Sequence, residues 1–365
     1  MAEALALPYP VAAGTDLLPP ALLASPLLRG LFERAARQRR RIVLCEGDDD
    51  RVARAGALAQ QAGVADIVLL STQRKDAADP AGLQRLHPAD LPADEAEALA
   101  QALFELRRHK GLALEQARLQ VREPLVLANL MVATGRAEGC VSGAVHTTAD
   151  VVRAAIQIIG KQPQASLVSS FFLMITRPGA LAGAGEQPHG LIFTDCGLVV
   201  SPSASELAEI ARAGAHSARQ LLGEEPRLAM LSFSTNGSAS HQLVDKVREA
   251  TALLHASDPA LKADGEVQLD AALVPDIARR KVQGSAVGGH ANVLVFPDLN
   301  AGNIGYKLAE RVGGAKAIGP LLQGLRKPAN DLSRGCGADD VFHVIAVTVV
   351  QAQAAKRLAS IEVSL

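Results

Sequence analysis

Short apolar segments alternate along the chain with longer segments in which apolar residues recur every three or four positions. The short segments are rich in Val, Ile, Leu and Phe, which is typical of buried strands. They cover residues 41–45, 67–70, 166–174, 190–193, 228–233 and 292–296. Because strands alternate with helices, the pattern predicts an α/β fold with largely parallel sheets.

The clearest helical pattern covers residues 203–222. Ser203 and Glu206 have the spacing of a capping box, in which each side chain accepts a hydrogen bond from the other residue's amide. Apolar or small residues then follow at helical spacing and predict one buried face; they are Leu207, Ile210, Ala211, Gly214, Ala218 and Leu221.

Two segments interrupt the alternation, residues 177–190 and 257–265, and their Gly, Pro and polar residues predict surface loops. We predict an N-terminal arm at 1–24, a first α/β domain at 25–155 and a second at 156–365. The C-terminal segment is a candidate to return to the first domain. The resulting fold class is two α/β domains.

Composition narrows the class of function. The chain has 365 residues, 48% of them hydrophobic, which is enough for two packed cores. With 37 basic and 38 acidic residues it lacks the positive field that favours nucleic acid or an anionic membrane. No apolar segment reaches the ~18 residues of a membrane span. Four widely spaced cysteines indicate neither a metal site nor a disulfide framework, so we expect a cytoplasmic protein.

Common catalytic motifs are missing from the sequence. It contains no G-x-x-x-x-G-K-[ST], no H-E-x-x-H, no C-x-x-C and no G-x-G-x-x-G that opens a helix after a strand. Hydrolysis of nucleoside triphosphates, zinc chemistry and ordinary dinucleotide binding therefore lose their usual sequence support.

Residues 331–340 (Asp-Leu-Ser-Arg-Gly-Cys-Gly-Ala-Asp-Asp) are the most unusual segment, and they precede an apolar helical pattern at 341–354. Amides at a helix start attract anions, glycines allow close approach, and Arg334 could bind two oxygens of a phosphate. The structural alternative is that Ser333 only caps the helix and that Asp339 and Asp340 complement its dipole.

Several segments in the same order resemble the phosphate acetyl/butyryl transferase family. They are residues 46–51 (Glu-Gly-Asp-Asp-Asp-Arg), 106–111 (Leu-Arg-Arg-His-Lys-Gly), 141–153 (Val-Ser-Gly-Ala-Val-His-Thr-Thr-Ala-Asp-Val-Val-Arg), 296–306 (Phe-Pro-Asp-Leu-Asn-Ala-Gly-Asn-Ile-Gly-Tyr), 319–324 (Gly-Pro-Leu-Leu-Gln-Gly) and 327–336 (Lys-Pro-Ala-Asn-Asp-Leu-Ser-Arg-Gly-Cys). The last three are the most specific.

The resemblance implies two α/β domains like those of isocitrate and isopropylmalate dehydrogenases, with the active site in the cleft between them, and a homodimer. The implied reaction transfers acetyl between acetyl phosphate and coenzyme A and releases phosphate, without metal or prosthetic group. By motif position the catalytic residues are Ser333, Arg334 and Asp340, and the substrate-binding residues are Arg107, Arg153, Lys281 and Arg311.

The chemistry of the implied reaction fits these residue types. Coenzyme A must lose a thiol proton, and acetyl phosphate brings a dianionic leaving group, so a base and several cations are needed. Asp340 can act as the base only if its surroundings narrow the gap between an aspartate pKa of about 3.9 and a thiol pKa of about 8.5, roughly 6 kcal/mol. The alternative for Arg107 is an exposed basic helix face. For His146 a structural role is equally plausible, so no catalytic role is assigned.

Three other functions remain open. A phosphate butyryltransferase would differ only in its acyl pocket, where a methylene is worth about 1–3 kcal/mol. A similar domain also serves in some malic enzymes as a non-catalytic acetyl-CoA sensor, although Ser333, Arg334 and Asp340 favour an active enzyme. A hydride-transferring decarboxylase shares the fold class, but the sequence lacks its metal-binding carboxylate cluster.

Overall fold

The computed structural model describes residues 18, 25–73, 82–181 and 185–362, which form two compact units. Unit 1 comprises Met1–Ile159 and Lys327–Leu365, and unit 2 comprises Gly160–Arg326. The C-terminal segment, which the domain prediction gave as part of residues 156–365 but also as a candidate to return to the first domain, thus groups with the first part of the chain. Apart from Leu18, the predicted arm at 1–24 lies outside the described residues.

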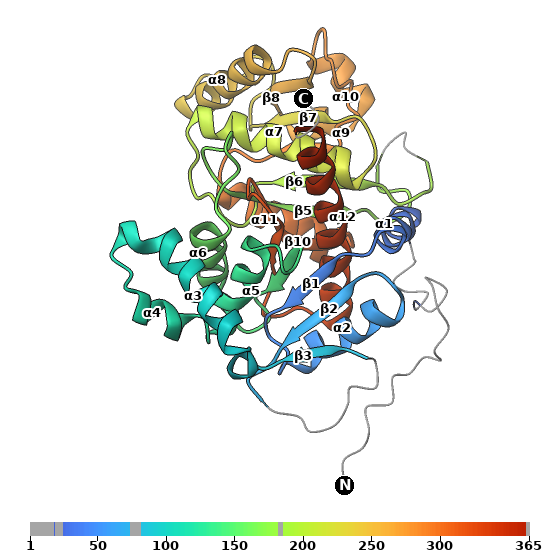
Figure 1. The fold of residues 1–365 in the computed structure, drawn as a ribbon. Coiled ribbons are helices and arrows are strands. Elements are labelled where there is room, and N and C mark those ends of the chain that lie inside the picture. The colour runs from blue at the N-terminus through green and yellow to red at the C-terminus, as the bar shows by residue number, and fades with distance from the viewer. Residues whose placement is uncertain (1–17, 19–24, 74–81, 182–184, 363–365) are drawn as a thin grey trace. The chain divides into compact units, whose positions relative to one another are not determined.

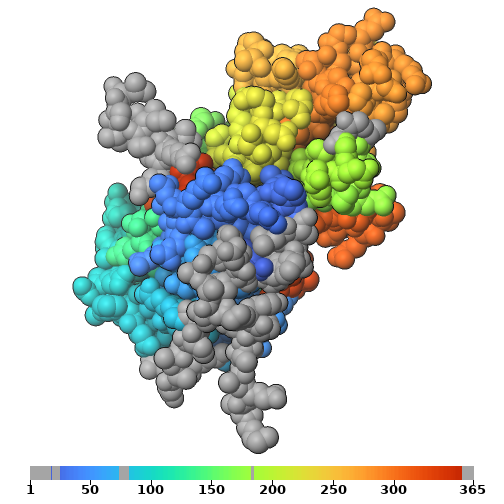
Figure 2. All heavy atoms as spheres, turned by 90° about the vertical axis from the view of Figure 1, so that its right-hand side faces the viewer, coloured from blue at the N-terminus to red at the C-terminus, as the bar shows by residue number. Residues whose placement is uncertain are grey.

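Unit 1 is built on a parallel five-stranded sheet in the order β11-β4-β1-β2-β3. Its strands are β1 (Arg41–Leu44), β2 (Asp66–Leu70), β3 (Gln84–Leu86), β4 (Gly139–Ser142) and β11 (Ala329–Asp331). Its α-helices are α1 (Pro26–Arg37), α2 (Asp50–Gln61), α3 (Ala93–Arg107), α4 (Leu114–Gln120), α5 (Pro124–Ala133), α6 (Thr148–Ile158) and α12 (Ala338–Glu362), and short 3-10 turns cover Pro88–Asp90 and Arg108–Lys110. Residues of α1, in dark blue, are part of the surface seen in Figure 2.

Helix α12 is the core element of unit 1 and packs against α1, α2 and the sheet (Figure 1). The predicted helical pattern at 341–354 is confirmed and lies within α12. Most of its side chains from Val341 to Val350 are fully buried, and Phe342 meets Phe32 of α1 edge to face at 5.1 Å. The returning chain therefore completes the core of unit 1 and supplies its edge strand β11.

Unit 2 is built on a mixed six-stranded sheet in the order β10-β5-β6-β9-β7-β8. Strand β5 runs antiparallel to both neighbours, and the other pairs are parallel. The strands are β5 (Ser169–Ile175), β6 (Gly190–Thr194), β7 (Arg227–Leu231), β8 (Lys262–Val267), β9 (Val293–Val295) and β10 (Lys316–Gln323). The helices are α7 (Ala204–Leu221), α8 (Gln242–Ser257), α9 (Leu269–Leu273), α10 (Pro275–Lys281) and α11 (Leu299–Arg311).

The α/β fold class with largely parallel sheets is confirmed, as is the helix predicted at 203–222. Both halves of its capping box form, between Ser203 and Glu206. The loop predicted at 257–265 is wrong in its second half, where β8 begins at Lys262. This strand is polar because it lies at the edge of the sheet and pairs only with β7. No helix in the described part of the chain has the length and apolar character needed to cross a membrane.

Candidate active site

Three of the motif segments meet at the carboxyl ends of strands in the unit 1 sheet. Strands β11, β4 and β1 are neighbours and run parallel, so their carboxyl ends lie side by side. Glu46 follows β1, Gly143 follows β4, and Ser333 follows β11. Proteins with open parallel sheets bind their ligands just outside the carboxyl ends of the strands. The topology thus brings residues separated by almost the whole chain into one candidate site.

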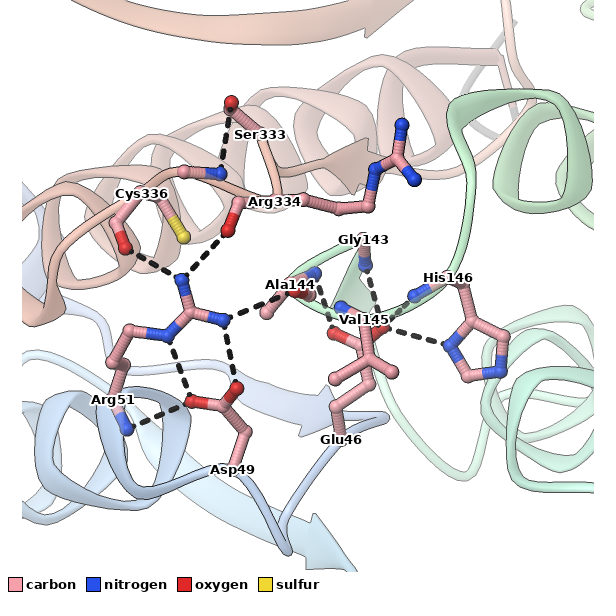
Figure 3. A network of polar contacts seen from close by, with 11 residues as sticks. Glu46, Asp49, Arg51, Gly143, Ala144, Val145, His146, Ser333, Arg334 and Cys336 are labelled. Atoms are coloured by element: carbon pink, nitrogen blue, oxygen red, sulfur yellow. Dashed lines mark hydrogen bonds and ion pairs between the residues drawn. The ribbon is translucent and has the colours of Figure 1, made fainter.

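The carboxylate of Glu46 holds the turn after β4. Its Oε1 accepts hydrogen bonds from the amides of Gly143 at 3.1 Å, Val145 at 2.9 Å and His146 at 2.8 Å, and its Oε2 accepts one from Ala144 at 2.7 Å. Gly143 has a φ of 109°, a backbone conformation that favours glycine. The four amides of this turn therefore bind a carboxylate of the protein itself (Figure 3).

The imidazole of His146 adds a fifth contact to the same carboxylate, Nδ1 to Oε1 at 2.7 Å. Burial raises the pKa of Glu46, but the hydrogen bonds from His146 and the backbone amides outweigh it, so the net pKa lies below the ordinary value. The hydrogen bond to Glu46 raises the pKa of His146. The role that His146 fills in the structure is to hold Glu46.

Arg51 joins the turn after β4 to the segment after β11. Its guanidinium donates to the carbonyl oxygens of Arg334 and Cys336, each at 2.8 Å, and to that of Ala144 at 3.0 Å. Asp49 pairs with its other edge at 2.7 and 3.0 Å, and these bonds lower the pKa of the Asp49 carboxyl. One side chain thus fixes three backbone carbonyls, as Figure 3 shows.

The segment from Ser333 to Cys336 forms a turn that directs its carbonyls inward and its polar side chains outward. The Cys336 amide donates to the Ser333 carbonyl at 2.9 Å, and the Gly335 amide donates to the Ser333 hydroxyl at 3.3 Å. Ser333 therefore does not cap α12, which begins at Ala338. The side chain of Arg334 is exposed and points away from Arg51 in Figure 3. An exposed hydroxyl group and an exposed guanidinium are thus carried by two consecutive residues whose backbone is held in place.

Asp340 lies in the first turn of α12, and its Oδ2 accepts a hydrogen bond from the Gly337 amide at 2.9 Å. This contact is half of a capping box, so the structural alternative for Asp340 is present in the molecule. It does not exclude a second role for Asp340, because the side chain is partly exposed and the hydrogen bond uses only Oδ2. Cys336 is buried, which raises the pKa of its thiol and agrees with a packing role.

Arg107 and Arg153 both belong to unit 1. Arg107 ends α3 and lines a shallow cavity of about 230 Å³ with Lys110 and three glutamines; the lining residues also include Gly111 and Leu112. Arg153 is exposed on α6 and pairs with Asp150 at 2.8 Å. A surface pair of this kind is worth only about 0–1 kcal/mol, so the guanidinium can exchange partners at little cost.

Lys281 and Arg311 belong to unit 2. Lys281 ends α10 and contacts Asp270 at 2.8 Å and Gln268 at 3.1 Å. Arg311 ends α11 and pairs with Glu310 at 3.3 Å. The structure thus brings Ser333, Arg334 and Asp340 together in unit 1 and leaves these two cations in the other unit. Within the described ranges, no three His, Cys, Asp or Glu side chains are grouped to hold a metal ion.

Sequence reasoning assigned no role to Glu46, Arg51 or Asp331, three residues that organise the site. Asp331 is fully buried at the end of β11, and its Oδ2 accepts a hydrogen bond from the Thr148 hydroxyl at 2.6 Å. Glu46 and Arg51 lie in a motif segment that sequence analysis singled out, but their partners are about a hundred residues away or more. The sequence therefore singles out the segment that holds Glu46 and Arg51, but it does not show which distant residues these side chains contact.

Comparison with known proteins identifies the family of this chain. Residues 27–349 match the model of the phosphate acetyl/butaryl transferase family. The chain belongs to this family. The phosphate acetyltransferase of Paracoccus denitrificans is 49% identical over 322 residues, which cover 88% of this chain and 98% of that protein. The phosphate acetyltransferase of Thermoanaerobacterium thermosaccharolyticum is 46% identical over 330 residues, 90% of this chain and 99% of that one.

Solved structures of this transferase family are also similar. A phosphotransacetylase from Streptococcus pyogenes superposes with a TM-score of 0.81 at 41% identity and covers 90% of this chain and 98% of its own. A phosphotransacetylase from Staphylococcus aureus gives a TM-score of 0.78 at 40% identity, with 89% and 98% covered. The family resemblance expected from the motif segments is therefore confirmed.

Proposed function

We propose that this protein is a phosphate acetyltransferase, which transfers acetyl reversibly between acetyl phosphate and coenzyme A. The observation that carries the proposal is the turn after β11, where Ser333 and Arg334 are exposed while Arg51 holds the carbonyl oxygens of Arg334 and Cys336, each at 2.8 Å. The names of relatives that match this chain over almost their full length support the acetyl substrate.

The reaction proceeds by direct attack. The thiol of coenzyme A loses its proton, and the thiolate sulfur forms a bond with the carbonyl carbon of acetyl phosphate. The bond from this carbon to the bridging phosphate oxygen breaks, and phosphate leaves with the electron pair. No acyl group is attached to the enzyme at any stage, so the protein has only to deprotonate the thiol, orient the reactants and neutralise developing charge.

We assign these tasks to the residues found together in unit 1. The guanidinium of Arg334 neutralises the carbonyl oxygen or the departing phosphate, since a guanidinium can donate two parallel hydrogen bonds to such oxygens. The Ser333 hydroxyl orients the sulfur or the carbonyl group. Asp340 accepts the thiol proton. Arg107, Arg153, Lys281 and Arg311 bind the phosphate groups of the two substrates.

We further propose that catalysis needs no metal or prosthetic group, because arginine side chains are available to neutralise the phosphate. The four cysteines are free and buried, which supports a reducing, cytoplasmic location. A homodimer is supported by exposed apolar residues at helical spacing, Ile304 and Leu308 on α11 and Val312 directly after it. Replacing Leu308 with Glu should shift the protein to monomer in sedimentation if these residues form the dimer contact.

The decisive experiment follows the absorbance of the thioester formed from acetyl phosphate and coenzyme A. We expect acetyl-CoA to form at the same rate with and without chelator, and butyryl phosphate to react more slowly. A rate abolished by chelation would refute the metal-free reaction. Faster turnover of butyryl phosphate would indicate a butyryltransferase, and binding of acetyl-CoA without turnover would indicate a sensor.

A further inference from the structure

Asp331 is a buried carboxyl group at the centre of the candidate active site. It ends β11, two residues before Ser333, and none of its side chain is exposed. Its Oδ2 accepts the hydrogen bond from the hydroxyl of Thr148, the first residue of α6. Its Oδ1 has no hydrogen-bond partner among the described residues. Such an arrangement is costly for a buried carboxyl group and calls for a reason.

The carboxyl group of Asp331 is closely packed by its neighbours. A Cβ atom on Gly143 would lie 2.1 Å from its Oδ1, so the backbone of the turn after β4 passes directly against the carboxyl group. The carboxyl group therefore touches the turn held by Glu46, the start of α6 and the strand that leads to Ser333. Helix α6 also carries Arg153, one of the proposed substrate-binding residues.

We propose that Asp331 is a positioning residue for acetyl transfer, which fixes the start of α6 against the strand end that carries Ser333 and Arg334. This inference rests on the proposed function. Asp331 touches no substrate, because it is fully buried; it acts through the residues on either side. Loss of the Thr148 contact displaces two groups that must meet the substrates together, and small displacements of such groups are known to slow catalysis strongly.

The protonation state indicates which variant should replace Asp331 without harm. Burial is the main reason that the pKa of Asp331 is raised to about 7; the charge of Glu46 adds to the rise, and the Thr148 hydroxyl and the Leu332 amide oppose it. The carboxyl group therefore takes up a proton far more readily than an exposed aspartate does. Asparagine has the size of the neutral acid and keeps an oxygen that accepts from Thr148.

The neighbouring residue on β11 provides a matched control. Asn330 is also buried, but it points to the opposite face of the sheet, where its amide donates to the hydroxyl of Thr348 on α12 at 2.9 Å. Replacing Thr348 with Val removes a threonine hydroxyl that contacts the same strand, on the face away from α6. It should cost stability without affecting catalysis.

The test measures kcat and KM for acetyl-CoA formation together with hydrogen exchange of the amides from Gly335 to Gly337. We expect Asp331→Ala and Thr148→Val to lower kcat by about tenfold or more, which corresponds to about 1.4 kcal/mol, and to speed exchange of these amides. Asp331→Asn should stay within about threefold of the parent enzyme, a difference smaller than one hydrogen bond. Thr348→Val should change only the unfolding midpoint.

The outcomes separate this inference from the function on which it rests. A parent protein without turnover refutes the proposed function, whereas the exchange measurement needs no turnover and still reports how firmly the segment is held. Unchanged exchange and kcat in folded Asp331→Ala and Thr148→Val would overturn the inference. So would Asp331→Asn if it were as slow as Asp331→Ala, because the oxygen facing Thr148 would then not matter.

Discussion

Replacing Glu46 with Gln tests whether the turn after β4 is held by charge. The carboxylate accepts four backbone amides and the imidazole of His146 at 2.7–3.1 Å while almost fully buried. Glutamine keeps one oxygen but places an NH₂ group where the second oxygen lies, and that group would face the donor amide of Ala144. The variant therefore loses a hydrogen bond and retains a buried, unpaired donor.

The magnitude follows from the loss of the charge. Hydrogen bonds to a charged group are worth about 1.5–3 kcal/mol each, but bonds that share one acceptor do not add. Breaking a buried charged contact by removing one partner typically costs about 3–5 kcal/mol, and this is the destabilisation we expect for Glu46→Gln. Because the turn contacts the Arg51 network through Ala144, kcat should fall as well.

The pH dependence has a predictable sign. The pKa of Glu46 is lowered by folding, so its stabilisation is present above its unfolded pKa of about 4.5 and is lost as pH falls through the lower folded value. The pKa of His146 is raised, so its contribution is complete below about 6.5 and is lost as pH rises through the higher folded value. The stability difference between parent and variant should be largest between these two values.

Denaturant unfolding at several pH values, with slopes compared, measures this difference. Glu95→Gln is the matched control, because Glu95 pairs with Arg136 at 2.9 Å in a partly exposed position and should cost no more than about 1 kcal/mol. If Glu46→Gln costs as little as the control, or the same amount at every pH, the charge does not hold the turn.

Three further predictions concern the site. Asp340→Asn should lower kcat by about 10²–10⁴, the usual range for a general base, with partial rescue at high pH, whereas Asp339→Asn should have little effect; equal small effects in kcat–pH profiles would leave Asp340 as a capping residue. Arg153→Ala should weaken substrate use by about 1.5–3 kcal/mol in kcat/KM, and parent-like kinetics would remove it from the site. Gly143→Ala should cost more than about 3 kcal/mol, because its Cβ would lie 2.1 Å from a buried oxygen, whereas Gly111→Ala, with a similar φ but open space, should cost about 1 kcal/mol in thermal unfolding.

The elements that the sequence predicted correctly are those with a strong local pattern. The apolar segments at 41–45 and 67–70 correspond to β1 and β2, which are buried on both faces and therefore show continuous hydrophobic residues. Helix α7 was predicted with its cap, because both capping residues lie within one turn of the chain. Local signals of this kind need no knowledge of the rest of the fold.

The elements that were missed depend on distant partners. Strands β4 and β11 are only a few residues long and lie inside motif segments, where functional residues replace the usual strand pattern. Edge strand β8 is polar, and Gly265 within it approaches Met230 too closely for a side chain. Polar and glycine-containing strands are specified by their neighbours, which single-sequence patterns do not show.

The same contrast holds for the site. Ser333, Arg334 and Asp340 could be proposed from the sequence, because they lie in one segment that resembles a motif of the family. The role of Arg51 could not, because its acceptors on Arg334 and Cys336 are backbone carbonyls more than 280 positions further along the chain. Every residue has a backbone carbonyl, so the side chains at positions 334 and 336 do not reveal that Arg51 binds there.

The insertion of unit 2 into unit 1 also determines the order in which the protein can assemble on the ribosome. Residues 160–326 are complete before β11 and α12 have been synthesised, so unit 2 can fold while unit 1 still lacks its edge strand and its central helix. Until α12 has been synthesised, the apolar faces of β1, β4 and α2 that pack against it stay exposed to solvent. The first part of unit 1 therefore exposes apolar surface during synthesis, and the candidate site can form only after β11 and α12 have left the ribosome.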